Sequence, residues 1–168
     1  MIGQAERMVE LNRLRRKSNT KVAMCPIIAF ASGKGGTGKS FVSLNTAYAL
    51  TRNNNKVLLV DLDANLSNIN IMLNIAAGKN LYHFFNRECF LPDIVHEYDN
   101  NLHFLFGESG KIDHPDIKEE KIIYLFEHLS SISANYDFII LDTASGAGED
   151  VLSTLSYADQ RVIVTTPE

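Results

Sequence analysis

The feature that most limits what this chain can fold into is a glycine-rich segment, Gly33-Lys34-Gly35-Gly36-Thr37-Gly38-Lys39-Ser40. It matches the pattern GxxxxGK[ST], in which closely spaced glycines lead to a lysine and a hydroxyl residue. The apolar run Pro26–Ser32 precedes it, and a helical pattern over Lys39–Arg52 follows it. A strand, a glycine loop and a helix in that order bind anions, because backbone N–H groups and the helix N-terminus face the ligand. The sequence therefore predicts that residues 33–40 bind phosphates.

Two side chains of this segment indicate which phosphates are bound. Lys39 is expected to reach the β and γ phosphates of a nucleoside triphosphate, and the Ser40 hydroxyl to ligate Mg²⁺. The nucleotide and Mg²⁺ are thus the predicted ligands. The residues expected to contact the nucleotide are Gly33, Lys34, Gly35, Gly36, Thr37, Gly38, Lys39, Ser40 and Phe41.

Three carboxylates follow the ends of predicted strands. Asp142 follows the apolar run Phe138–Leu141, while Asp61 and Asp63 lie at the end of the run Lys56–Leu62. The carboxyl ends of parallel strands border the ligand crevice of such a sheet, so we expect Asp61, Asp142 and Ser40 to surround magnesium. Asp63 lies farther along the chain and is expected to position the water that attacks the γ-phosphate. The alternative is that these acids cap the helices that follow.

Predicted strands and helices alternate along the chain, which predicts an α/β fold. The expected architecture is a mostly parallel sheet flanked by helices on both faces. Strands are predicted at Pro26–Ser32, Lys56–Leu62, Leu102–Phe106, Tyr136–Leu141 and Arg161–Thr165, and helices at Lys39–Arg52, Lys118–Ala134 and Asp150–Tyr157, with a loop and short helix over Asn65–Asn74. Because the chain stops directly after a core-type strand, we expect the sequence to be a fragment of a longer protein.

Composition and charge divide the chain into two parts. Hydrophobic residues make up 45% and charged residues 21% of the 168 residues, as in ordinary globular domains. Cys25 and Cys89 lack metal-ligand spacing, so an intracellular location is expected. Residues 1–21 are rich in lysine and arginine, whereas the whole chain has a net charge of −4. We therefore expect a basic arm over residues 1–21, which meets a partner, and an ATPase domain over residues 22–168.

The position of Lys34, directly after the first glycine, resembles the deviant Walker A motif of the MinD/ParA family of ATPases. The DLDANLSNINIML stretch from Asp61 and the YDFIILDT stretch ending at Thr143 are also similar to that family. This resemblance implies ATP as the nucleotide and ATP-dependent homodimers, in which Lys34 reaches the partner's phosphates. It implies catalytic roles for Lys34, Lys39 and Asp63.

Within that family the chain looks most like the FlhG (FleN, YlxH) group, which regulates flagellar number and placement. Gln4-Ala5 in the basic arm resembles that group's activator segment, which implies that residues 4–17 contact an FlhF-like GTPase. Flagellar switch-complex proteins are further implied partners. The implied location is the bacterial cytoplasm, peripheral to the inner membrane in a full-length form.

The alternative within the family is a ParA-like chromosome or plasmid partition ATPase. Partition proteins usually bind DNA through basic residues in the C-terminal half, and this half is acidic here, so nucleic acid is not an expected partner. A nitrogenase-type iron protein would need cluster cysteines after two later strands, and neither cysteine lies there. The intact lysines and acids of the motifs argue against an inactive paralogue.

Overall fold

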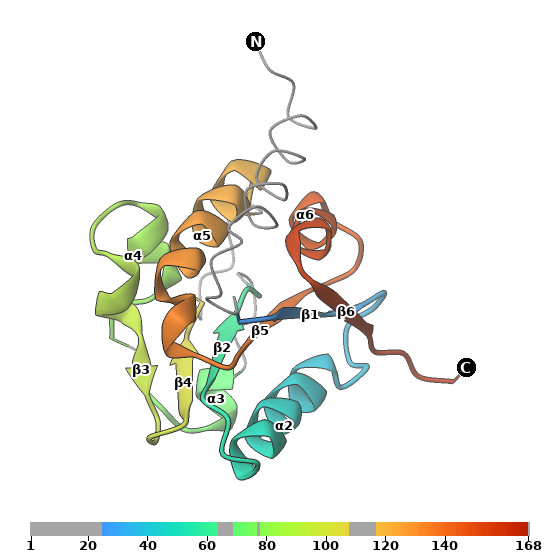
Figure 1. Cartoon of the computed structure of the whole chain (residues 1–168). Helices are drawn as coiled ribbons and strands as arrows, with labels where there is room; N and C mark the ends of the chain where they lie inside the picture. The colour runs from blue at the N-terminus through green and yellow to red at the C-terminus, as the bar shows by residue number, and fades with distance from the viewer. Residues whose placement is uncertain (1–24, 64–68, 77, 108–116, 168) are drawn as a thin grey trace.

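The computed structural model describes residues 25–63, 69–76, 78–107 and 117–167 (Figure 1). A six-stranded sheet in the order β3-β4-β2-β5-β1-β6 forms the centre of the described part. All its pairs are parallel except β3–β4. The strands are β1 (Ile27–Ser32), β2 (Val57–Asp61), β3 (His96–Glu97), β4 (Leu102–Leu105), β5 (Phe138–Ser145) and β6 (Gln160–Ile163).

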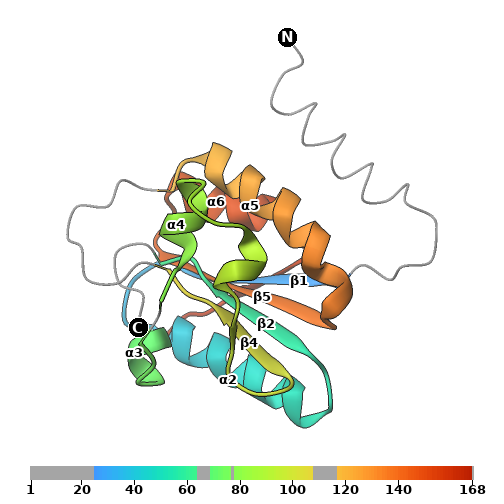
Figure 2. The same ribbon diagram turned by 90° about the vertical axis from the view of Figure 1, so that its left-hand side faces the viewer.

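Helices cover both faces of this sheet (Figure 2). Helices α4 (Leu81–Phe85), α5 (Glu119–Ile132) and α6 (Glu149–Tyr157) lie on one face, and α2 (Lys39–Arg52) and α3 (Ile69–Met72) lie on the other (Figures 1 and 2). Two short 3-10 turns, η1 (Leu91–Ile94) and η2 (Ser133–Asn135), complete the described elements. The predicted α/β fold with helices on both faces is confirmed.

The central strands are buried on both faces, which explains their continuous apolar runs. Every residue of β1, β2 and β4 is buried. Side chains of a strand alternate between faces, and Leu58 and Val60 accordingly join the core under α5, whereas Val57 and Leu59 join the core over α2. The sheet is thus fixed from both sides, and this rigid centre determines where the loops at the strand ends lie.

Most predicted elements are present, and the differences concern short segments. The structure adds α4, η1 and β3, which the sequence analysis did not predict. Helix α4 has five residues, and Asn80 begins it by accepting a hydrogen bond from the backbone N–H of Tyr82 at 3.1 Å. Strand β5 also runs on to Ser145, beyond the predicted end at Leu141. The predicted basic arm at residues 1–21, with its partner-contacting segment at residues 4–17, lies outside the described residues.

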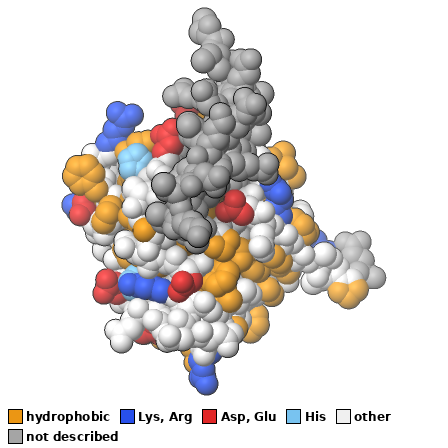
Figure 3. Space-filling view, viewed as in Figure 1, with side chains coloured by type: hydrophobic (Ala, Val, Ile, Leu, Met, Phe, Trp, Pro, Cys, Tyr) orange, Lys and Arg blue, Asp and Glu red, His pale blue; other side chains and the backbone are white. Residues whose placement is uncertain are grey.

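One edge of the sheet and one helix present apolar side chains to solvent. Strand β6 is the edge strand, and Ile163 is 59% exposed there. Hydrophobic side chains also gather over and beside α2 (Figure 3), where Phe41, Val42 and Tyr48 are exposed. In the described ranges, no helix combines the length and the hydropathy that a bilayer crossing requires.

Candidate functional site

The glycine-rich segment forms a tight loop between the end of β1 and the start of α2. Gly36 and Gly38 have φ angles of 77° and 84°, a region that side chains other than glycine rarely adopt. The Ser32 hydroxyl donates a hydrogen bond to the carbonyl of Lys34 at 3.0 Å, which anchors the first half of the loop. Gly38 is the N-cap of α2, so the loop ends where the helix presents its unpaired N–H groups. This geometry suits an anion.

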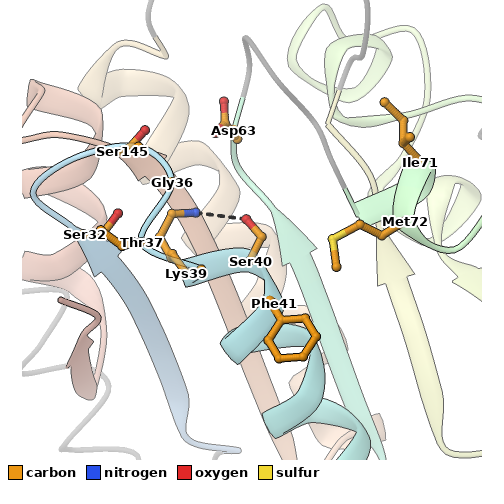
Figure 4. A pocket seen from close by; sticks show the side chains of 12 residues that line it. Ser32, Gly36, Thr37, Lys39, Ser40, Phe41, Asp63, Ile71, Met72 and Ser145 are labelled. Carbon is orange, nitrogen blue, oxygen red and sulfur yellow. Dashed lines mark hydrogen bonds between the residues drawn. The ribbon is translucent and has the colours of Figure 1, made fainter. Parts of the chain in front are cut away.

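A buried ion pair lies beneath the loop. The Lys39 ammonium group is 3.0 Å from Oδ1 of Asp142, and the two side chains are only 6% and 0% exposed. The same ammonium group donates to Oγ of Ser40 at 3.4 Å (Figure 4). Asp142 lies inside β5, which runs on to Ser145, and is in register with Asp61, the last residue of β2. The sheet therefore brings residues that are 103 positions apart in the chain into direct contact.

Two buried oxygens at this site lack hydrogen-bond partners within the described part of the chain. They are Oδ2 of Asp142 and Oγ1 of Thr37. Buried polar atoms in native proteins are almost always paired with protein, water or ligand. A cation, or a water bound to a cation, would therefore supply the interaction that Oδ2 of Asp142 lacks.

Asp61 and Asp63 occupy different environments despite their spacing of two residues. Asp61 is 1% exposed, and its two oxygens accept hydrogen bonds from the backbone N–H groups of Asp63 at 3.1 Å and Ile69 at 3.4 Å. Asp63 is half-buried and lines the cavity above the loop. The two carboxylates thus have different contacts: Asp61 binds the backbone N–H groups of Asp63 and Ile69, and Asp63 faces the open space.

That open space is a cavity of about 410 Å³ along the loop and the start of α2. Its lining residues are Ser32, Gly35, Gly36, Thr37, Gly38, Lys39, Ser40, Phe41, Asp63, Ile71, Met72 and Ser145. The loop side of the cavity is polar, while Met72 extends from α3 toward Phe41 on the other side (Figure 4). Phe41 and Ile71 are 61% and 67% exposed, so this apolar wall is open to a ligand.

The structure places most of the predicted site residues together and adds four others. Lys34 and Gly33 are exposed at the start of the loop, and Asp142 lies beneath it next to Lys39. The added residues are Ser32, Ile71, Met72 and Ser145. Ser32 could have been found from the sequence, because it ends the predicted strand before the loop. Ser145 could not, since the predicted strand ended at Leu141 and only the structure extends β5 to Ser145. No signal in the sequence distinguishes Ile71 and Met72 from core residues.

Comparison with known proteins identifies relatives that match most of this chain. A family model described as an AAA domain matches residues 25–168. The flagellum site-determining protein YlxH of Helicobacter pylori is 33% identical over 100% of this chain and 58% of its own length. The antiactivator FleN of Pseudomonas aeruginosa is 30% identical over 84% of this chain and 51% of its own length.

A solved structure with a similar fold carries a nucleotide. The septum site-determining protein MinD of Pyrococcus horikoshii, complexed with Mg-ADP, has a TM-score of 0.71 and 31% identity to this chain. The match covers 86% of this chain and 59% of the MinD chain. The chain therefore spans only about half to three fifths of the length of these three relatives.

Proposed function

Because this chain belongs to the AAA-domain family and is related to the MinD/ParA P-loop ATPases, we propose that it is a magnesium-dependent ATPase whose two subunits pair when ATP is bound. The observation that carries this proposal is the buried Lys39–Asp142 contact beneath the glycine loop, in which Gly36 and Gly38 have left-handed backbone conformations. A lysine held in this way presents its charge to the phosphates that the loop amides surround.

The cavity accounts for binding of the whole nucleotide. Its volume of about 410 Å³ is within the range of small-molecule sites, and its two sides differ in chemistry. The loop from Gly33 to Ser40 would hold the phosphates through backbone N–H groups. Phe41 follows directly in α2, where its exposed ring is available to the nucleoside part of ATP. The segment thus binds one end of the ligand by charge and the other by apolar contact.

Magnesium fits this site as an ion held by the nucleotide phosphates together with a few protein oxygens. No group of three or more histidine, cysteine or acidic side chains that could hold a metal occurs among the described residues. Magnesium in nucleotide sites is commonly held by one or two protein oxygens together with phosphates and water. Ser40 would supply a hydroxyl ligand and Oδ2 of Asp142 would accept from a metal-bound water, while Asp61 would support the site from its backbone contacts. The metal would neutralise the developing charge on the phosphates.

Hydrolysis requires a water in line with the γ-phosphate, and we assign Asp63, which lines the cavity, to hold it. In this step the water oxygen bonds to the γ-phosphorus, the bond to the bridging oxygen of ADP breaks, and the Asp63 carboxylate holds the water's proton. Lys39 would stabilise the leaving phosphates in the same subunit. Lys34, exposed at the beginning of the loop, would reach the phosphates bound by a second copy.

The names of this chain's relatives suggest the process in which an ATP-dependent dimer of this kind acts. YlxH and FleN carry names that refer to flagellum placement and to control of an activator. We therefore propose a role in flagellar number or placement, with residues 4–17 contacting an FlhF-like GTPase and switch-complex proteins as further partners. The protein would act in the bacterial cytoplasm, with a peripheral association at the inner membrane. The basic arm at residues 1–21 and the ATPase domain at residues 22–168 would be its two parts.

ATP-dependent pairing can be tested with the Lys34→Ala variant. Wild-type protein with Mg·AMPPNP should sediment as a dimer, and Lys34→Ala as a monomer that still binds the nucleotide, because Lys34 would contact the partner's phosphates. Lys79→Ala removes an exposed lysine of another loop and should dimerise like wild type. A Lys34→Ala protein that dimerises normally, or a wild-type chain that stays monomeric at saturating nucleotide, would refute the proposal.

A further inference from the structure

The pairing of β1 with β5 continues past the buried strands and fixes Ser145 beside the glycine loop. Register between the strands runs from Ile27 and Ile139 to Phe30 and Asp142, and then shifts so that Ser32 pairs with Ser145. The backbone N–H of Gly146 donates to the carbonyl of Ser32 at 2.8 Å. The last residue of β5 is therefore held at the point where the loop leaves β1.

The two serines of this pair have different environments. Ser32 is buried, and its hydroxyl is already used in the hydrogen bond to the Lys34 carbonyl. Ser145 is exposed and lines the cavity. A Cβ atom placed on Gly35 would lie 3.6 Å from Oγ of Ser145, so this hydroxyl directly faces the loop backbone. Of these two serines, Ser145 is therefore the one whose hydroxyl is open to a ligand that occupies the loop.

The position of Ser145 along the cavity indicates which part of the ligand it meets. Ser40 and the start of α2 lie at one end of the loop, and Gly35 lies at the other. Asp63 and Ser145 come from the ends of neighbouring strands and stand above the loop (Figure 4). A phosphate chain that extended from α2 along the loop would end between these two side chains, with its terminal phosphate next to Ser145.

We infer that Ser145 is a specificity-determining residue whose hydroxyl donates a hydrogen bond to the terminal phosphate of the bound nucleoside triphosphate. This inference rests on the proposed function. A hydroxyl that donates to a phosphate oxygen makes a charge-assisted bond, which is stronger than a bond between neutral groups. A nucleoside diphosphate has no group at that position. Ser145 therefore strengthens binding of the triphosphate and leaves binding of the diphosphate unchanged.

The test is calorimetric titration of wild type, Ser145→Ala and Ser145→Thr with Mg·AMPPNP and with Mg·ADP. Ser145→Ala should bind AMPPNP about tenfold more weakly, the effect of losing one hydrogen bond to a charged group, and ADP within twofold of wild type. Ser145→Thr, which keeps the hydroxyl, should restore the preference. Ser130→Ala, a change to an exposed serine of α5, is the matched control and should match wild type.

The outcomes separate this inference from the proposed function. If Ser145→Ala lowers the affinity for both nucleotides equally, or for neither, the inference is wrong while nucleotide binding stands. If Ser145→Thr shows the same loss as Ser145→Ala, the hydroxyl is not the group responsible and the inference is also wrong. If wild-type protein binds neither nucleotide, both the inference and the proposed function are wrong.

Discussion

Polar side chains at the amino ends of the parallel strands differ in their hydrogen bonding from those at the carboxyl ends. At the amino ends of the strands, polar side chains are paired with the chain itself. At the carboxyl ends, two buried oxygens of the described residues lack hydrogen-bond partners, and the backbone adopts left-handed glycine conformations. Satisfied groups stabilise a fold, whereas unsatisfied buried groups cost free energy unless a ligand pairs with them. The difference indicates which end of the sheet is built for binding.

Contacts at the amino ends illustrate the first case. Asp137 accepts a hydrogen bond from the backbone N–H of Lys56 at 2.7 Å, and Asp159 accepts one from Ile27 at 2.9 Å. Nδ1 of His103 lies 3.0 Å from the hydroxyl of Tyr136. Burial raises the pKa of Tyr136 to about 12, and burial and then the charge of Lys56 lower the pKa of His103. Both pKa shifts favour the neutral form of the side chain.

The carboxyl ends illustrate the second case. Lys39 and Asp142 form an ion pair that is almost fully removed from solvent, yet one oxygen of Asp142 stays unpaired within the described chain. Removing charges from water is costly, and the attraction within one pair offsets that cost only when the remaining hydrogen-bonding positions are also filled. An Mg–nucleotide complex would fill them. The proposed nucleotide site therefore gives this buried pair a role in binding.

The largest effect among the acids is predicted for Asp63→Ala, which alters the carboxyl end without removing a phosphate contact. Nucleotide binding should be preserved, because Asp63 faces the cavity and the loop is unaffected. Single-turnover hydrolysis should slow by about 100-fold, a typical loss for a positioned proton acceptor. Asp63→Asn retains the shape of the side chain without its charge and should be similarly slow. Hydrolysis at the wild-type rate in either variant would show that another group positions the water.

A smaller effect is predicted at the amino end, for Asp137→Ala. The variant leaves the backbone N–H of Lys56 without its acceptor and should lower the free energy of unfolding by on the order of 1 kcal/mol in urea titration. Asp137→Asn retains an acceptor oxygen and should lose less. Calorimetry should give the wild-type affinity for Mg·ATP in both variants. A loss of nucleotide affinity without a loss of stability would contradict the contrast between the two ends.

The central strands could be predicted from the sequence, because strands buried on both faces have continuous runs of apolar residues. The runs that became β1, β2 and β4 are buried on both faces, and the glycine–lysine motif placed its loop between β1 and α2. The resemblance to the MinD/ParA group is confirmed by relatives such as YlxH and MinD. The sequence could not predict α4 or β3, which have five and two residues and depend on tertiary contacts.

Within the site, the sequence predicted residue types better than their environments. The order of Asp61 and Asp63 along the chain predicted that Asp61 serves magnesium and that Asp63 positions the attacking water. The structure gives them different environments, because Asp61 accepts hydrogen bonds from the backbone N–H groups of Asp63 and Ile69, whereas Asp63 lines the cavity. The apolar wall formed by Ile71 and Met72 was not predicted either, since it depends on the packing of α3 beside the cavity. Roles of individual site residues remain predictions for the variants described above.

The most direct test of the contrast between the two ends is calorimetric binding of Mg·ATP to wild type and to Lys39→Ala. Wild-type protein should bind, and the variant should show no measurable binding, because Lys39 is proposed to carry the charge that contacts the phosphates. Circular dichroism should show that the variant retains its secondary structure. Binding of Mg·ATP by Lys39→Ala with wild-type affinity would contradict the assignment of the carboxyl end as the nucleotide site.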